Sequence, residues 1–135
     1  MDSDEVRPHL SPELGFSRED RDKNVRRMGY VAGLLARHGV YVIVAAVSPY
    51  HEARAAVRCS VPRFLEIFVD CPLDVCATRD VKGMYAQALA GKRPRFTGID
   101  DPYEIPASPD VVVNTGTETI PRCLETIVET LRAHG

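Results

Sequence analysis

The stretch Gly15-Phe-Ser-Arg-Glu-Asp-Arg-Asp-Lys-Asn-Val-Arg-Arg27 decides how the rest of this 135-residue chain is interpreted. Ser17 followed three residues later by Asp20 is a helix-start signature, in which the hydroxyl caps a free backbone N–H and the carboxylate reaches back. The pattern predicts an amphipathic helix that ends at Gly39. Its apolar residues recur at steps of three and four, at Val25, Met28, Ala32 and Leu35.

Two polar side chains of this helix, Arg21 and Asn24, fall on its apolar face when successive residues are turned by about 100°. A cation and an amide on an inward face need a partner there. That partner is either a carboxylate or loop of the same chain, or a ligand. The opposite face carries residues that we expect to be solvated: Lys23, Arg26, Tyr30 and Arg37.

The composition limits the class of protein. Of the residues, 44% are hydrophobic and 27% are charged, as in soluble globular proteins of one domain. A net charge of -2 gives no electrostatic footprint for nucleic acid or a membrane surface. The longest apolar run, residues 40–47, is too short to span a bilayer, and the acidic N-terminus has no apolar targeting segment. We therefore expect a cytoplasmic protein that binds neither nucleic acid nor membranes.

The four cysteines are expected to be free thiols, buried or half-buried. They form no Cys-x-x-Cys pair, and no histidine stands at zinc spacing from them. Disulfides are also rare in the cytoplasm. These residues are Cys59, Cys71, Cys76 and Cys123.

Strands and helices are predicted to alternate along the chain. Three apolar stretches rich in β-branched residues predict strands, over residues 40–47, 64–70 and 111–113. The first of them is apolar throughout, as in a strand buried on both faces of a parallel sheet. Helices are predicted over residues 49–59, 72–79, 84–90 and 119–133, the last with Ile120, Cys123, Leu124, Ile127, Val128 and Leu131 on one face. This order indicates an α/β fold, with a mostly parallel sheet flanked by helices.

Ser48 is a candidate site residue because of its position. It follows the expected central strand 40–47, and as an N-cap before Pro49 it would start the next helix. Ligands bind at this place in open α/β sheets, and the unpaired N–H groups favour anions. Ser48 is therefore either an anion contact or a plain N-cap.

Two stretches lack periodicity. Residues 2–7 carry carboxylates two positions apart, which share one side if the stretch is extended. The alternative is a frayed terminus. Residues 8–15 are expected to be loop. Residues 96–109 predict a long loop, which in a compact domain is more often functional than not. Phe96 in that loop either stacks on a flat ligand or fills core.

Together these segments resemble the adenylylsulfate (APS) kinase family, which transfers the γ-phosphate of ATP to the 3′-hydroxyl of APS to make PAPS in sulfate assimilation. The resemblance spans nearly the whole chain and implies one P-loop-kinase-like domain over residues 1–135. The last of the matching blocks, residues 96–104, is highly specific. The matching blocks are Asp2-Ser-Asp-Glu-Val-Arg7, residues 14–27, Ser48-Pro-Tyr50, Arg79-Asp-Val-Lys-Gly83 and Phe96-Thr-Gly-Ile-Asp-Asp-Pro-Tyr-Glu104.

The resemblance also implies roles for individual residues. Phe16 and Phe96 would clamp the adenine, while Arg7, Arg21 and Asn24 would hold the sulfate and phosphate region, to which guanidinium groups are suited. The implied catalytic residues are Asp4, Ser48 and Lys82, with Asp4 also near Mg²⁺, and Arg79 would contact ATP. The residues implied to contact APS are Asp2, Arg7, Phe16, Arg21, Asn24, Val47, Ser48, Lys82, Phe96 and Thr97.

The chain departs from the family pattern in one large respect, and in two smaller ones: Ser3 stands for a glycine, and Ala46-Val47 stand where the family often has phenylalanine and isoleucine. No Gly-x-x-x-x-Gly-Lys-Ser/Thr motif occurs in the 135 residues, and the pair Gly91-Lys92 is followed by arginine. That motif supplies phosphate-binding N–H groups, a lysine and a hydroxyl for magnesium. The implied domain thus lacks the family's first strand, P-loop and first helix. Since that strand lies between those expected at 40–47 and 64–70, both would have an unpaired edge.

Three functions are therefore considered. The first is an APS kinase that uses Mg²⁺ with ATP, of which we expect at most trace activity from these 135 residues alone. The second is a non-catalytic APS- or PAPS-binding protein. The third, a kinase for another small hydroxyl acceptor, conflicts with the block at residues 96–104. The expected partners are APS and ATP, together with a second copy of the chain or an ATP sulfurylase.

Overall fold

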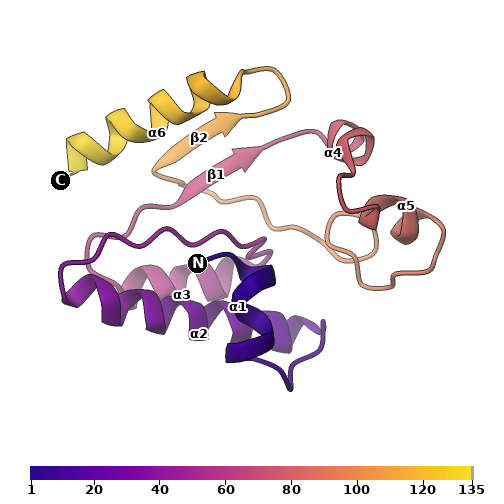
Figure 1. Ribbon diagram of the computed structural model, residues 1–135, viewed down its shortest axis with the longest axis horizontal. Helices are drawn as coiled ribbons and strands as arrows, with labels where there is room; N and C mark the ends of the chain where they lie inside the picture. Colours follow the sequence, from indigo (N-terminus) through magenta and orange to yellow (C-terminus); the bar gives the residue numbers. More distant parts are fainter. Residues whose placement is uncertain (135) are drawn as a thin grey trace. The chain divides into compact units, whose positions relative to one another are not determined.

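The computed structural model describes residues 1–134, which divide into two compact units. The N-terminal unit holds residues 1–64 with 103–105, and the C-terminal unit holds residues 65–102 with 106–134. The prediction of a single domain over residues 1–135 stays a prediction. The element order is α1 (Ser3–Leu10), α2 (Arg18–Arg37), α3 (His51–Ser60), β1 (Ile67–Asp70), α4 (Leu73–Arg79), α5 (Met84–Leu89), β2 (Val111–Asn114) and α6 (Ile120–His134) (Figure 1).

Helix α2 begins and ends where its local sequence signals predict. The Ser17 hydroxyl accepts a hydrogen bond from the Asp20 N–H at 3.1 Å, while the Asp20 carboxylate accepts one from the Gly15 N–H at 3.0 Å. At the other end Gly39 has a φ of +81°, and the following N–H reaches back to the Leu35 carbonyl at 3.2 Å. This closing turn needs a left-handed residue, which explains the glycine.

The predicted inward face of α2 is confirmed in most positions. Asn24, Met28 and Ala32 are buried, and the residues expected to be solvated (Lys23, Arg26, Tyr30 and Arg37) are exposed. Leu35 is 40% exposed, so its assignment to the buried face is wrong. Leu35 lies in the last turn of α2, just before the helix ends at Arg37.

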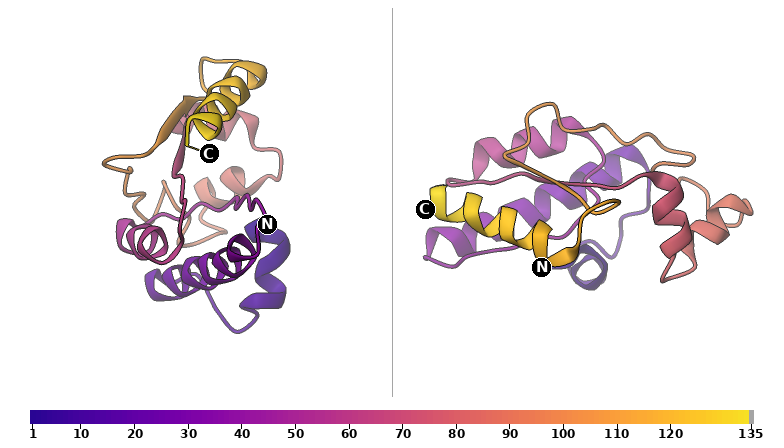
Figure 2. Two further views of the ribbon diagram at one scale, coloured as in Figure 1. Left: turned by 90° about the vertical axis from the view of Figure 1, so that its left-hand side faces the viewer. Right: turned by 90° about the horizontal axis from the view of Figure 1, so that it is seen from above.

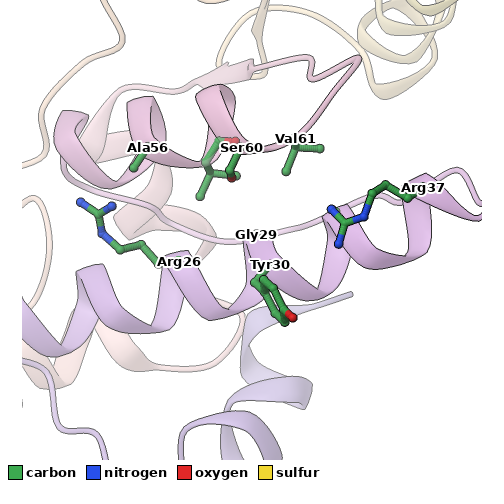
Figure 3. A pocket seen from close by; sticks show the side chains of 9 residues that line it. Arg26, Gly29, Tyr30, Arg37, Ala56, Ser60 and Val61 are labelled. Carbon is green, nitrogen blue, oxygen red and sulfur yellow. Dashed lines mark hydrogen bonds between the residues drawn. The ribbon is translucent and has the colours of Figure 1, made fainter.

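Helices α2 and α3 approach each other closely because glycine lines the contact. A Cβ added at Gly29 would lie 2.6 Å from a methyl group of Val57, and one at Gly33 would lie 3.3 Å from a methyl group of Val61. Since both contacts advance by four residues in the same direction, the two helices run parallel, and Figure 2 shows them side by side. The outer side of this contact is a groove with Arg26 at one end and Arg37 at the other (Figure 3).

The prediction of a buried strand over residues 40–47 is wrong. Ala45 alone bridges to another segment, pairing in parallel with Asp2, and Tyr41 and Ile43 are 94% and 80% exposed. The β-branched composition correctly predicts an extended backbone, but a strand also needs a partner along its length. In the described part of the chain, that partner is limited to the first few residues.

Residues 2–7, considered above as an extended stretch or a frayed terminus, are neither, and the loop expected over residues 8–15 begins only after Leu10. These residues begin α1, and the Asp2 carboxylate caps it by accepting from the Asp4 N–H at 2.8 Å. Asp4 and Glu5 occupy the first turn, where carboxylates favour a helix. The helix continues through Pro8 to Leu10, so the two carboxylates do not share one side of an extended chain.

The C-terminal unit is built on two parallel strands. β1 pairs with β2 in a register that runs from Ile67 opposite Val111 to Asp70 opposite Asn114 (Figure 1). Helix α6 covers this pair, and its Cys123 is buried with two valines of β2. The prediction of an α/β fold with parallel strands is confirmed, although two strands are present in residues 1–134 rather than three.

The apolar face predicted for α6 is narrower than expected. Cys123 is buried and Ile127 is partly buried, but Ile120, Leu124 and Leu131 are 81%, 57% and 42% exposed. Two strands cover only a narrow stripe of a helix. The helices predicted near residues 72–79 and 84–90 are confirmed as α4 and α5, with Pro72 as the N-cap of α4.

All four cysteines are free, as predicted, but Cys59 is exposed rather than buried or half-buried. Within residues 1–134, no group of three or more histidine, cysteine, aspartate or glutamate side chains lies close enough to hold a metal ion. No helix of the described chain is long and apolar enough to cross a membrane.

The close helix contact gives a stability prediction. Gly29→Ala should lower the free energy of unfolding by about 1–3 kcal/mol, because the new methyl group overlaps Val57. Gly33→Ala is the matched control, since its methyl group meets Val61 at 3.3 Å and the substitution also gains helix propensity. Urea unfolding followed by circular dichroism measures both. Equal stabilities of the two variants would contradict the packing argument.

Candidate functional site

Two predicted site residues, Arg7 and Arg21, lie against the ring of Phe16 in the N-terminal unit, and Asn24 follows Arg21 by one turn of α2. The guanidinium carbon of Arg7 lies 4.6 Å from the ring centroid, and that of Arg21 lies 5.5 Å from it. Arg7 donates to the Gly15 carbonyl, and Arg21 Nε donates to the Phe16 carbonyl at 3.1 Å. These bonds fix both cations beside the ring. We call Arg7, Phe16, Arg21 and Asn24 the basic cluster.

The basic cluster brings two like charges together. Burial lowers the pKa of Arg7 below its ordinary value, and the nearby charge of Arg21 lowers it further. Asp20 and Asp4 act in the opposite direction, which limits the repulsion. Two guanidinium groups held this close form a site with a preference for an anion.

Asn24 adds an unmet hydrogen-bonding group to the cluster. Asn24 is 3% exposed, and its amide nitrogen donates to the Ser3 hydroxyl at 3.4 Å. The amide oxygen has no hydrogen-bond partner among the described residues. A buried acceptor without a donor is costly and points to a ligand or ordered water. Phe16 is 49% exposed, so its ring is open to a flat molecule.

Ser48 is not an N-cap, so that part of its interpretation is wrong. Helix α3 starts at His51 with Tyr50 in the capping position, and Ser48 instead has a φ of +43°. This left-handed conformation is strained for serine and persists because Arg54 holds the turn. One Arg54 nitrogen donates to the Ser48 carbonyl and another to the Glu104 carbonyl, both at 2.6 Å.

The carboxylate of Glu104 supplies the cap that serine does not. It accepts from the His51 N–H at 2.6 Å and pairs with Arg18 at 3.0 Å. The first bond is the main cause of a lowered pKa at Glu104, with Arg18 second. The α3 N-terminus, predicted as an anion site beside Ser48, is thus bound by the chain's own carboxylate.

The predicted phosphate-contacting residues lie around α4 in the C-terminal unit. Arg79 donates to the Thr115 carbonyl at 2.7 Å and to the Cys71 sulfur at 3.9 Å. Lys82 is exposed in the turn that leads to α5. Asp80 fixes that turn by accepting from two N–H groups of α5, at 3.0 and 2.9 Å, and these bonds lower its pKa.

Phe96 opens a tight turn in the same unit. Its carbonyl accepts from the N–H groups of residues 99, 100 and 101. Its ring meets that of Tyr85 edge-on, with centroids 4.9 Å apart, so it is partly packed in the protein interior. The Thr97 hydroxyl is buried with no partner among the described residues. The adenine clamp of Phe16 with Phe96 joins different units and stays a prediction.

The structure therefore groups the predicted residues into sets. Arg7, Phe16, Arg21 and Asn24 form one cluster, with Asp2 and Asp4 at the start of α1. Sequence reasoning missed Arg54, because no local signal indicates that it holds a turn six residues before it. Tyr103 and Glu104 belong to a quoted block, but nothing in that block predicts a cap on α3. The remaining predicted residues are Val47 and Ser48 in the Ser48 turn, and Arg79, Lys82, Phe96 and Thr97 in the C-terminal unit.

Comparisons with known proteins give the family of the chain. A family model described as Adenylylsulphate kinase matches residues 1–114. The chain belongs to this family. The adenylyl-sulfate kinase of Synechococcus sp. (strain JA-3-3Ab) is 56% identical over 135 residues, which are 100% of this chain and 77% of that protein.

Two further members of the adenylylsulfate kinase family are similar to this chain, one a curated relative and the other a solved structure. The probable bifunctional SAT/APS kinase 2 of Sorangium cellulosum (strain So ce56) is 53% identical over 135 residues, 100% of this chain and 23% of that protein. The solved structure of Mycobacterium tuberculosis APS kinase CysC with AMPPNP and APS has a TM-score of 0.90 at 41% identity. It covers 98% of this chain and 78% of that chain. The family and the kinase class predicted from the sequence are therefore confirmed.

The Glu104 cap gives a pH prediction. Because its pKa lies below the ordinary 4.5, this carboxylate stabilises the fold above about pH 4.5, and the contribution is lost as the pH falls through the lower folded value. Glu104→Gln should therefore lower the melting temperature at pH 7, with the difference from the parent protein shrinking toward pH 3. Glu52→Gln is the matched control, since it removes a first-turn charge of α3 but leaves the His51 bond intact. Thermal melts across this pH range measure both variants. A pH-independent loss at Glu104 would contradict the prediction.

Proposed function

We propose that this protein acts in the phosphorylation of adenosine 5′-phosphosulfate, with ATP as the phosphoryl donor. The observation that carries the proposal is the basic cluster, in which two guanidinium groups lie against an exposed aromatic ring and the same helix as Arg21 carries a buried, unpaired amide oxygen at Asn24. APS combines a flat base with sulfate and phosphate oxygens. Each part of the cluster matches one of these features.

The contacts to APS follow from the chemistry of each side chain. Arg7 and Arg21 would donate to the phosphosulfate oxygens, and a bound anion would offset the burial and the repulsion from Arg21 that lower the pKa of Arg7. The Asn24 amide oxygen would accept a hydrogen bond from the substrate. The Phe16 ring would stack on the adenine, with Phe96 as the expected second face.

The transfer step is assigned to polar groups near the start of α1 and after α4. Asp4 would orient the 3′-hydroxyl or accept its proton. Lys82 would offset negative charge on the transferred phosphoryl group, with Arg79 near the ATP phosphates. The further contacts proposed are Asp2, Val47, Ser48 and Thr97.

Magnesium would enter this reaction with ATP. Mg²⁺ in such sites is bound by one or two carboxylates together with substrate phosphates, rather than by a cage made of protein alone. The Asp4 carboxylate, placed in the first turn of α1 beside the Asp2 cap, has the oxygen donors that this ion prefers. Bound there, the ion would neutralise charge on the phosphates.

Association with other proteins is part of the proposal. The Sorangium cellulosum relative carries a second activity in its name, SAT, beside APS kinase, and an APS kinase from Thiobacillus denitrificans is described as hexameric. We expect this chain to associate with an ATP sulfurylase or with a second copy of itself. A cytoplasmic location remains our expectation.

Substrate binding tests the proposal directly. Arg21→Ala should weaken APS binding by about 10- to 100-fold, the loss expected for charge-assisted hydrogen bonds of 1.5–3 kcal/mol. Arg37→Ala is the matched control, because it removes a cation from the exposed face of the same helix. Isothermal titration with APS in the absence of ATP measures both. Equal affinities for the two variants would contradict the assignment of the basic cluster.

A transfer assay distinguishes the two leading functions. APS-dependent release of ADP from magnesium-ATP would support the kinase, and its loss in Lys82→Ala would support the role of that lysine. At most trace release is expected from these 135 residues, so turnover at rates usual for kinases would contradict that expectation. Binding of APS with no detectable ADP release would favour the alternative, a non-catalytic APS- or PAPS-binding protein. Absence of APS binding would overturn both.

A further inference from the structure

Cys71 and Cys76 lie on either side of the N-terminus of α4. Cys71 directly follows Asp70, the last residue of β1, and Pro72 is the N-cap of the helix. Cys71 therefore stands one residue before the cap and Cys76 at the fourth position of the helix. Side chains at these two positions pack against each other in the hydrophobic staple that fixes a chain's entry into a helix. Here both members of the staple are thiols.

The contacts of the two sulfurs agree with this placement. The Cys76 sulfur lies 3.9 Å from the Cys71 carbonyl oxygen, and the neighbouring Cys71 thiol adds to the effect of burial in raising the pKa of Cys76. Arg79, one turn further along α4, donates to the Cys71 sulfur at 3.9 Å. Tyr85 is also a neighbour of Cys76: burial raises the pKa of the tyrosine, and the nearby thiol raises it further. Both cysteines are partly exposed, so reagents in solution can reach them.

We propose that Cys71 and Cys76 form a redox-active pair, which closes to an intramolecular disulfide on reaction with a low-molecular-weight disulfide such as oxidised glutathione. In the first step the Cys71 thiolate attacks one sulfur of the oxidant, breaks its S–S bond and releases one glutathione thiolate. In the second, Cys76 loses its proton and attacks the Cys71 sulfur, releasing the second glutathione. The two cysteines are oxidised by two electrons, and the oxidant is reduced to two thiols.

The surroundings assign different roles to the two sulfurs. Cys71 precedes the helix cap and its sulfur is contacted by the guanidinium of Arg79, and we assign it the attacking role. Burial raises the pKa of Cys76, and its hydrogen bond with Cys71 raises it further, so Cys76 is suited to the second, resolving step. The ring between the two residues is short, so closing it constrains the unfolded chain little. The disulfide is therefore expected to be readily reduced.

Closure would also change the contacts of Arg79, the last residue of α4. A sulfur held in a disulfide no longer receives the Arg79 hydrogen bond as a thiolate would, which alters one of the two contacts that fix this arginine. The disulfide does not depend on the proposed function. If Arg79 contacts ATP as proposed above, oxidation would reach the nucleotide site through this side chain.

Mapping of the cysteines by mass spectrometry tests the proposal on the intact chain. The protein is equilibrated in glutathione buffers of rising oxidised fraction, quenched in acid, alkylated with N-ethylmaleimide and digested with trypsin. Cleavage at arginine puts the proposed pair together on residues 64–79, with Cys59 on residues 59–63 and Cys123 on residues 123–132. We expect residues 64–79 to lose both alkyl groups together and to be lighter than the dithiol peptide by two hydrogens.

The outcomes that overturn the proposal are distinct. Peptide 64–79 that stays doubly alkylated, or that carries glutathione without closing, in buffers where exposed Cys59 already carries glutathione would refute the pair. Cys76→Ser should trap glutathione on Cys71, while Cys59→Ser, the matched control, should leave closure unchanged. Should Cys76→Ser fail to fold by circular dichroism, the map of the unsubstituted protein still decides, since it needs no variant.

Discussion

One carboxylate, that of Glu104, connects three segments of the N-terminal unit that are far apart in the sequence. It caps α3 at His51 and pairs with Arg18 at the start of α2, while its own backbone binds the turn before α3. The short segment 103–105 belongs to this unit because of these bonds. The Ser48 turn keeps its strained backbone through Arg54, which donates to Glu104 as well. Loss of this charge therefore weakens the α3 cap and the Arg18 pair together, while the Ser48 turn keeps its bonds to Arg54 and to the Glu104 backbone.

The basic cluster illustrates a different balance. Two cations beside one aromatic ring and a buried amide without a full set of partners reduce stability, and a well-packed apolar group would cost less. Such an arrangement is expected where binding, rather than folding, has determined the residues. The hydrogen bonds from both arginines to backbone carbonyls keep the side chains in place before any anion arrives. The cluster is preorganised, which reduces the entropy lost on binding.

The sequence predicts those features that depend on local signals. The start of α2 follows from Ser17 and its end from Gly39, and both are found where expected. The strand prediction for residues 40–47 is wrong because strand pairing depends on a distant partner, which composition does not reveal. The sequence does not predict the Glu104 cap on His51 for the same reason, since 53 residues separate the two groups. The candidate site was predicted by resemblance, because periodicity alone left Arg21 and Asn24 without a definite partner.

The exposed stretch at residues 40–47 has a practical consequence for the protein in solution. It contains no charge and no proline, and it is rich in β-branched side chains. Segments of this composition with free backbone edges readily stack into intermolecular sheets. These eight residues outside the helices therefore offer an edge along which copies of the chain can pair in concentrated samples, whatever the stability of the folded units themselves.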